Sequence, residues 1–124
     1  MDNSVYKNNN LDAIFVAGEH CEVDTLRFCK KVFGVDNVHD HWWQSESGFP
    51  ITAAMKVPNQ PEGTSGLPVP GWDLKILDAD SKTEVSKPGV LGSVVVKKPL
   101  PPGALSGLWR NEELYHEYYL AGFE

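Results

Sequence analysis

Several features that would assign a protein to a common class are scarce or absent in this sequence. No stretch approaches the roughly 18 to 20 apolar residues that a membrane-spanning helix requires. Lys and Arg form no run, and the formal net charge is −6, which argues against binding a nucleic-acid backbone. The first ten residues, MDNSVYKNNN, have neither an apolar signal core nor the Arg-rich amphipathic pattern of a transit peptide. We therefore expect a soluble protein, with neither nucleic acid nor a membrane as partner.

Cysteine is also scarce, because only Cys21 and Cys29 occur among the 124 residues. A disulfide framework is therefore not indicated. Both cysteines fall where the sequence predicts the start of one helix and its second turn. We expect reduced thiols, with Cys29 acting as a small core hydrophobe. The chain contains neither an internal repeat nor a low-complexity tract.

The N-terminal part of the chain has the pattern of strand, loop, helix and strand. Residues 11–17, LDAIFVA, read as a buried strand that ends at Gly18. Apolar residues recur at helical spacing from 22 to 33, and Gly34 follows as a stop. Residues 35–41, VDNVHDH, offer a second strand. This order predicts a parallel βαβ unit, in which the loops after the two strands lie beside each other at one rim.

The composition changes beyond Pro50. Residues 56–71 hold four prolines and three glycines, which excludes a helix and predicts an ordered loop or a subdomain boundary. Later segments predict a strand with a turn at 78–81, a further strand in GVLGSVVVKK, and a helix capped by Asn111. The predicted fold class is α/β, a mixed α and β chain. It has a sheet-and-helix part at 1–55, a connecting loop at 56–71 and the start of a β-rich part at 72–124.

Two chemistries fit the tract HDHWWQSESGFP, residues 39–50, poorly. His39 and His41 would point the same way from a strand, with acidic side chains near them, but a structural zinc site needs four ligands and no second Cys/His cluster follows. Ser45 and Ser47 resemble a nucleophilic serine only superficially, because the glycine spacing of a serine elbow is missing. We therefore set dedicated zinc binding and hydrolase chemistry aside.

The same tract suits a pocket for an acid and a phosphate. Trp42 reads as a core residue, whereas Trp43, followed by polar residues, fits the wall of a pocket. Gln44 and Ser45 can contact a phosphate, and Glu46 can hold a divalent cation. A glycine after the first strand, at position 18, lets the backbone approach a ligand closely, so its neighbours at 19 and 20 are further candidates.

Four ordered motifs make the chain resemble a known family. The tract at 42–48 reads WWQSESG, and the family has W-W-Q-T-E-T-G. AGEHC at 17–21 is similar to the A-G-E-R-C of propionyl-CoA synthetase-like members, GLPVPG at 66–71 to G-x-P-V-P-G, and VVVKKPLPPGALSGLW at 94–109 to a run of the same branch. From about residue 11 onward the chain resembles the AMP-forming acyl-CoA synthetases of the adenylate-forming superfamily. The short-chain branch, with acetyl-CoA and propionyl-CoA synthetases, is the nearest.

This resemblance implies a role for each matching position. ATP, Mg²⁺ and coenzyme A are the implied cofactors and substrates, together with a short-chain fatty acid. His20 stands where the family usually has Arg or Pro. The implied ATP- and AMP-binding residues are Gly18, Glu19, His20 and Asp40 around the adenine and Gln44 and Ser45 toward the α-phosphate; Glu46 would bind Mg²⁺, and Ala17 and Trp43 would line the acyl pocket.

The resemblance also bears on which acid is used. Ala17 occupies a position that is valine in acetate-preferring relatives, and the smaller side chain leaves room for about one more carbon, worth on the order of 1 kcal/mol per methylene. We therefore expect a propionate–CoA ligase first and an acetate–CoA ligase next.

Parts of the family's site have no counterpart here. The chain shows no Ser/Thr/Gly-rich phosphate loop ending in lysine, no aspartate motif for the ribose and no C-terminal domain with the adenylation lysine. We expect an internal part of the large N-terminal domain of a ligase, catalytically silent alone, in the mitochondrial matrix of a eukaryote or the cytoplasm of a bacterium. The alternatives are a short non-catalytic protein that binds an adenine nucleotide or a partner, and a β-rich domain without a ligand.

Overall fold

The structure, a computed structural model, describes residues 10–55 and 60–122. The described residues form two compact units. The first unit contains the residues up to Ser45 together with Phe49–Val69, and the second contains Glu46–Gly48 and the residues from Pro70 onward. Within the described ranges, neither helix has the length and apolar character needed to cross a membrane.

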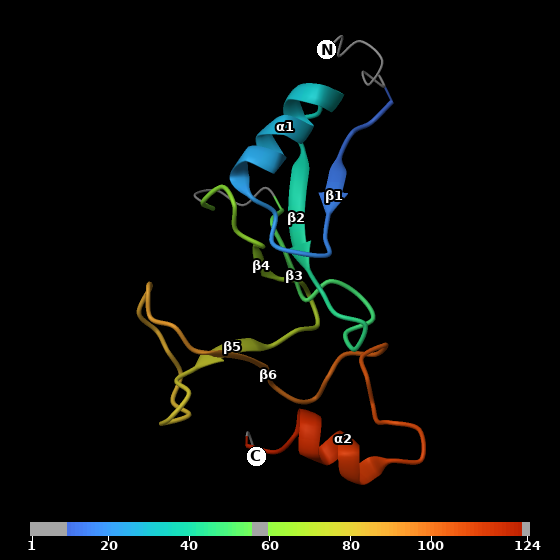
Figure 1. Ribbon diagram of the computed structural model, residues 1–124, viewed down its shortest axis with the longest axis vertical. Coiled ribbons are helices and arrows are strands. Elements are labelled where there is room, and N and C mark those ends of the chain that lie inside the picture. Colours follow the sequence, from blue (N-terminus) through green and yellow to red (C-terminus); the bar gives the residue numbers. More distant parts are fainter. Residues whose placement is uncertain (1–9, 56–59, 123–124) are drawn as a thin grey trace. The chain divides into compact units, whose positions relative to one another are not determined.

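A four-stranded sheet organises the first unit (Figure 1). Its first two strands run parallel and are joined through helix α1, so the predicted βαβ unit is confirmed. The third strand pairs antiparallel with the second, and the fourth with the third. In sheet order the strands are β1 (Ile14–Val16), β2 (Val38–Trp42), β3 (Thr52–Ala53) and β4 (Leu67–Pro68).

Helix α1 (Val23–Phe33) covers one side of this sheet. Its buried residue Leu26 packs in a small core with Cys21 and Val38. The helix stops at Gly34, which adopts a left-handed φ of 67° and donates its N–H to the Lys30 carbonyl. The helix and its glycine stop are thus as predicted. Both cysteines are free thiols; Cys21 is buried, and Cys29 packs against the core with partial burial.

The segment predicted as a connecting loop contains a short strand. Residues of β4 pair with β3, and the Val69 amide donates to the Ile51 carbonyl at 2.9 Å. Gly66 makes this pairing possible, since its φ is 86° and a Cβ atom there would overlap the backbone of Ala53. The proline and glycine content that excluded a helix did not exclude this pairing.

The second unit contains a two-stranded antiparallel sheet and a helix. Strand β5 (Leu74–Leu77) pairs along its length with β6 (Ser93–Val96). The predicted turn follows β5, where the Asp78 carboxylate accepts hydrogen bonds from the backbone N–H and the hydroxyl of Ser81. The hydrogen bond from the Ser81 backbone contributes most to lowering the pKa of the Asp78 carboxyl, and the bond from the Ser81 hydroxyl comes next. Helix α2 (Glu112–Tyr119) begins as predicted at Asn111, whose side chain accepts from the Leu114 amide at 3.1 Å.

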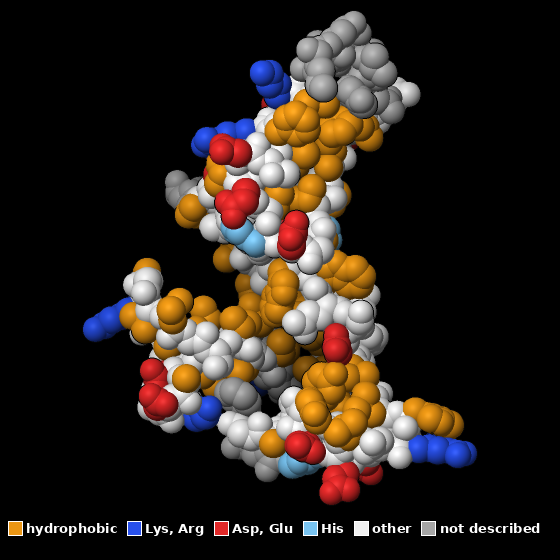
Figure 2. All heavy atoms as spheres, viewed as in Figure 1, with side chains coloured by type: hydrophobic (Ala, Val, Ile, Leu, Met, Phe, Trp, Pro, Cys, Tyr) orange, Lys and Arg blue, Asp and Glu red, His pale blue; other side chains and the backbone are white. Residues whose placement is uncertain are grey.

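Large apolar side chains remain exposed on both units. On the first unit, Figure 2 shows hydrophobic side chains at the surface over α1 and β1, where Phe15 and Phe28 are exposed. On the second unit, Leu91 and Trp109 are 94% and 86% exposed. Exposed residues of this size, on several elements, mark surfaces that suit contact with further protein.

Candidate functional site

Two exposed loops begin at the same end of the parallel pair β1 and β2. Val16 pairs with Asp40 in the register of these strands, so the loop that begins at Ala17 starts beside the last residues of β2 (Figure 1). Both loops therefore leave the sheet at its carboxyl end, which is where ligands gather in sheets of this kind. The structure thus confirms the parallel pair from which both loops begin, and the contact of the two loops with one ligand stays a prediction. The exposed candidates are Ala17, Gly18, Glu19 and His20 in the first loop and Trp43, Gln44 and Ser45 in the second.

Asp40 differs from the other candidates because it is buried within β2. Its side chain is 2% exposed and accepts a hydrogen bond from the Ser65 hydroxyl at 3.0 Å. The Ala54 amide donates to its backbone carbonyl at 2.7 Å. A buried carboxylate needs such donors, since an unpaired one is costly. Asp40 is therefore fixed by the β3–β4 side of the sheet and is not carried on a loop.

The ring of Phe15 contacts the rings of both histidines of the tract. Its centroid is 5.3 Å from that of His39 and 6.1 Å from that of His41. His39 is buried, and its Nδ1 lies 2.6 Å from the Ala54 carbonyl oxygen. Because a carbonyl only accepts, Nδ1 carries the proton in this contact. Within the described residues, no group of three or more His, Cys, Asp or Glu could hold a metal ion. The contacts of His39 are those of a structural side chain.

The two tryptophans differ in exposure. Trp42 lies in β2, is half-buried and pairs with Thr52 of β3. Trp43 follows the end of the strand and is 46% exposed. An indole that is half open at the end of a strand has an apolar face available to a ligand. Its assignment to the acyl pocket stays a prediction.

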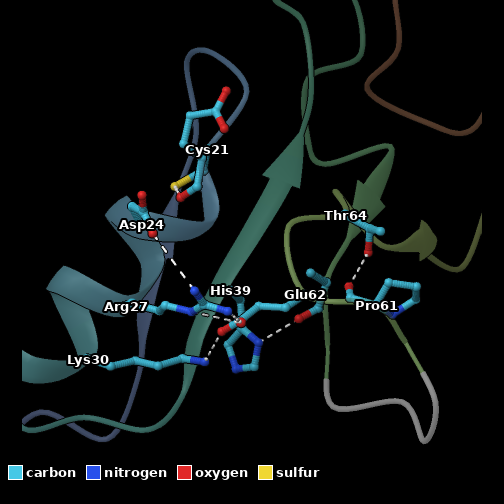
Figure 3. A network of polar contacts seen from close by, with 10 residues as sticks. Cys21, Asp24, Arg27, Lys30, His39, Pro61, Glu62 and Thr64 are labelled. Carbon is cyan, nitrogen blue, oxygen red and sulfur yellow. Dashed lines mark hydrogen bonds and ion pairs between the residues drawn. The ribbon is translucent and has the colours of Figure 1, made fainter.

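An ion-pair cluster links α1 to the loop that carries Ser65. Arg27 Nη2 donates to Glu62 Oε2 at 3.0 Å, and Lys30 Nζ donates to Glu62 Oε1 at 3.2 Å (Figure 3). The hydrogen bond from Lys30 contributes most to lowering the pKa of the Glu62 carboxyl, and the hydrogen bond from Arg27 comes next. The cluster is exposed, so it contributes little to stability. The cluster connects α1 to the loop that contains Glu62 and Ser65, and Ser65 is the donor to the Asp40 carboxylate.

Burial changes the chemistry of the thiol beside the first loop. Cys21 follows directly after His20 and is 8% exposed. Burial, and then the nearby charge of Asp40, raise the pKa of the Cys21 thiol. A raised pKa keeps the sulfur protonated and weakly nucleophilic at neutral pH. Cys21 is therefore a packing residue of this rim.

Glu46 belongs to the second unit, where it is held by two separate contacts. Its backbone carbonyl accepts from the Leu105 amide at 2.6 Å, and its carboxylate oxygen Oε1 accepts from the Tyr119 hydroxyl at 3.1 Å. The hydrogen bond to Glu46 raises the pKa of Tyr119. A pocket of about 650 Å³ lies next to this region and is lined by residues 98–106 and Tyr115. Glu46 itself is not part of that lining.

The chemistry of Glu46 fits the predicted magnesium role. Mg²⁺ is bound through one or two carboxylates and completes its coordination with phosphate oxygens and water. Glu46 is a half-buried carboxylate, and its Oε1 accepts a hydrogen bond from the Tyr119 hydroxyl. One such carboxylate suffices for a cation that is shared with the phosphates of a nucleotide.

Two residues of these sites were missed by reasoning from the sequence. Ser65 contacts Asp40 across 25 positions and Tyr119 contacts Glu46 across 73 positions. No local pattern marks either contact, since both depend on how distant segments meet. The one available signal for Tyr119 is its place at the end of a helix rich in aromatic residues.

The chain is similar to known proteins over most of its length. Residues 2–109 match the family described as "AMP-binding enzyme". The chain is 47% identical over 124 residues to "Acyl-CoA synthetase short-chain family member 3, mitochondrial" of Bos taurus, an alignment that covers 95% of this chain and 17% of that protein. It is 30% identical over 118 residues to "Propionate--CoA ligase" of Salmonella typhimurium, with 93% of this chain and 18% of that ligase covered. The chain thus spans less than a fifth of the length of these relatives.

Solved structures with the same fold include two proteins of more distant sequence. One is an anthranilate CoA ligase in complex with anthranoyl-AMP, with a TM-score of 0.71, 24% identity and coverage of 88% of this chain and 20% of that one. The other is apo MatB from Rhodopseudomonas palustris, with a TM-score of 0.69, 21% identity and coverage of 85% and 20%. At these identities the similarity is one of fold, and it agrees with the predicted α/β class.

Proposed function

Because this chain belongs to the AMP-binding enzyme family, which matches residues 2–109, we propose that it is part of an AMP-forming short-chain acyl-CoA ligase. The observation that supports the proposal is the parallel pairing of β1 with β2, because the Ala17–His20 loop and the Trp-Trp-Gln-Ser tract follow the carboxyl ends of these two neighbouring strands. An adenylate contacts several loops at once, and two of them start from this rim. The exposed apolar side chains on both units suit burial within a larger ligase.

The proposed reaction has two steps and needs no protein nucleophile. An oxygen of the carboxylate attacks the α-phosphorus of ATP, the bond to the bridging oxygen breaks, and pyrophosphate leaves. The thiol of coenzyme A then attacks the acyl carbon, and AMP leaves with the original carboxylate oxygen. Negative charge builds on phosphate oxygens in the first step, so preorganised donors and a cation are what the site must supply.

The residues of this chain divide that task. Gln44 and Ser45 donate hydrogen bonds toward the α-phosphate and orient it for in-line attack. Trp43 covers the acyl chain and excludes water. Glu46 would hold Mg²⁺, which supplies neutralisation of phosphate charge when bound. The remaining role, recognition of the adenine, falls to the exposed residues Gly18, Glu19 and His20, together with Asp40, which is buried in β2.

Propionate is the acid that we propose. Ala17 is exposed at the start of the first loop, beside the predicted acyl pocket, and its small side chain leaves space for a third carbon. One methylene in an apolar pocket is worth about 10- to 200-fold in discrimination. Acetate is the second candidate substrate.

Pyrophosphate exchange tests this assignment. In the full-length ligase that contains this chain, exchange of labelled pyrophosphate into ATP should depend on added propionate, and acetate should support it less. Ala17→Val, which adds two methyl groups, should lower the propionate-to-acetate ratio of kcat/KM by about ten-fold. Ala79→Val, in an exposed turn, is the matched control and should leave the ratio unchanged. An Ala17→Val ratio equal to that of the control would refute the pocket assignment.

The location follows from the source of the protein. Several relatives carry the word "mitochondrial" in their names, including those of Bos taurus and Homo sapiens. We propose the mitochondrial matrix if the source is a eukaryote and the cytoplasm if it is a bacterium.

A further inference from the structure

The contacts around Glu46 close into a ring of four residues. The Leu105 amide donates to the Glu46 carbonyl at 2.6 Å, and the Tyr115 hydroxyl donates to the Leu105 carbonyl at 3.3 Å. The rings of Tyr115 and Tyr119 lie 5.5 Å apart between centroids. The Tyr119 hydroxyl completes the ring by donating to Glu46 Oε1 at 3.1 Å. The backbone carbonyl and the side chain of Glu46 are thus both held by hydrogen bonds from this ring.

From this ring we propose that Tyr119 is a positioning residue, which holds the Glu46 carboxylate in the orientation that binds the divalent cation. The proposal rests on the proposed function, because it takes Glu46 as the cation ligand. It adds a residue that lies 73 positions further along the chain and outside every motif of the sequence analysis.

The segment that carries Glu46 has little freedom to move. Gly48 has a φ of 72°, and a Cβ atom there would overlap the Gly103 carbonyl oxygen, so the two backbones are in close approach. The Tyr115 hydroxyl of α2 donates to the Leu105 carbonyl, and the Leu105 amide donates to the Glu46 carbonyl. Residues 46–48 and the tyrosine pair are therefore connected by contacts other than the Tyr119 bond.

The carboxylate itself would be mobile without the tyrosine. A glutamate side chain has three rotatable bonds, and a half-buried one has several staggered positions open to it. The Tyr119 hydroxyl selects one of them through a bond to one oxygen, and the remaining lone pairs stay available to a cation. Partners that orient a metal ligand in this way typically change metal affinity by about 10- to 100-fold when removed.

Metal binding, measured separately from activity, tests the proposal. In the full-length ligase with AMP bound, free Mn²⁺ is followed by electron paramagnetic resonance, since carboxylate sites for Mg²⁺ also accept Mn²⁺. Tyr119→Phe removes only the hydroxyl and should weaken Mn²⁺ binding about ten-fold. Tyr118→Phe makes the same change at the neighbouring position, which is 72% exposed, and should leave binding within two-fold.

A double-substitution cycle separates positioning from a general loss of structure. In a Glu46→Gln background, Tyr119→Phe should cause no further loss of Mn²⁺ affinity, because the oriented carboxylate is already gone. Tyr115→Phe loosens the same ring without touching Glu46 and should weaken binding by less than Tyr119→Phe. If Tyr119→Phe lowers the melting temperature, the Mn²⁺ affinity of Tyr115→Phe still tests whether the ring affects metal binding.

Each result either supports or overturns the proposal. Equal Mn²⁺ affinity in Tyr119→Phe and Tyr118→Phe overturns it, and so does an equal loss from Tyr119→Phe with and without Glu46→Gln. If the unmodified ligase exchanges pyrophosphate and Tyr119→Phe still binds Mn²⁺ normally, only this inference fails. If the unmodified ligase shows no exchange, the proposed function fails and the inference fails with it.

Discussion

Replacing Gly66 with alanine tests the part of the fold that fixes Asp40. Gly66 follows Ser65, the donor to the Asp40 carboxylate, and precedes β4. Its φ of 86° is a left-handed conformation, and an added Cβ would overlap the Ala53 carbonyl and the amide nitrogen of Ala54. The substitution should therefore separate β4 from β3 and move Ser65 away from the carboxylate.

The size of the effect follows from two contributions. A left-handed backbone costs a non-glycine residue about 1–2 kcal/mol. Insertion of a methyl group where there is no room adds about 1–3 kcal/mol. Gly66→Ala should thus lower the free energy of unfolding by about 2–5 kcal/mol. Gly34→Ala, at the end of α1, has a φ of 67° and no atom within 4 Å of the added Cβ; it should show only the first contribution.

Urea unfolding measures the change in the free energy of unfolding, and amide hydrogen exchange shows which strand pairing is weakened. In Gly66→Ala the Val69 amide, which donates to Ile51, should lose protection, while the Ile14 amide, which donates to the Asn37 carbonyl at 2.8 Å, should keep more of it. A free energy of unfolding for Gly66→Ala within about 0.5 kcal/mol of that for Gly34→Ala would show that the close approach of β3 and β4 is wrong.

Three further predictions concern single contacts. Ser65→Ala should cost about 1–3 kcal/mol in urea unfolding, because it removes a donor from a buried carboxylate, whereas Ser86→Ala, at an exposed position, should stay within about 0.5 kcal/mol. Asn111→Ala should destabilise α2 by about 1 kcal/mol, and Asn111→Asp should preserve it, as helix circular dichroism would show. The pKa of Glu62 is lowered in the folded state, so its contribution is present above the ordinary value of 4.5 and is lost as the pH falls through the lowered value. Glu62→Gln should therefore differ from the parent in thermal unfolding at pH 7 and converge with it in acid; a difference that persists at low pH would contradict this.

The elements with local signals were predictable. Helix α1 and its Gly34 stop, and the start of α2 at Asn111, follow from spacing and capping chemistry. The parallel pairing of β1 with β2 follows from strand order alone, and it brought the two candidate loops to one end of the sheet. Pattern and connectivity thus predicted the frame of the site.

What the sequence did not predict depends on contacts between distant segments. The first strand covers Ile14–Val16 and not the whole apolar run at 11–17, because only Ile14, Phe15 and Val16 pair with residues of β2. β5 pairs along its length with β6, and the segment after the turn at Asp78 contributes a single bridge from Glu84 to Leu77. The burial of Asp40 and its bond to Ser65 depend on the pairing of β4 with β3. This pairing was not predicted, because β4 lies in a proline-rich segment that reads as a loop.

Transfer of labelled oxygen tests the central claim most directly. The full-length ligase is incubated with ATP, Mg²⁺, coenzyme A and propionate labelled with ¹⁸O in both carboxylate oxygens, and the nucleotide product is analysed by mass spectrometry. If the carboxylate attacks the α-phosphorus, as the account predicts, AMP carries one ¹⁸O atom and pyrophosphate carries none. Formation of ADP, with ¹⁸O in inorganic phosphate, would place the attack at the γ-phosphorus and contradict the assignment of this chain to an adenylate-forming ligase.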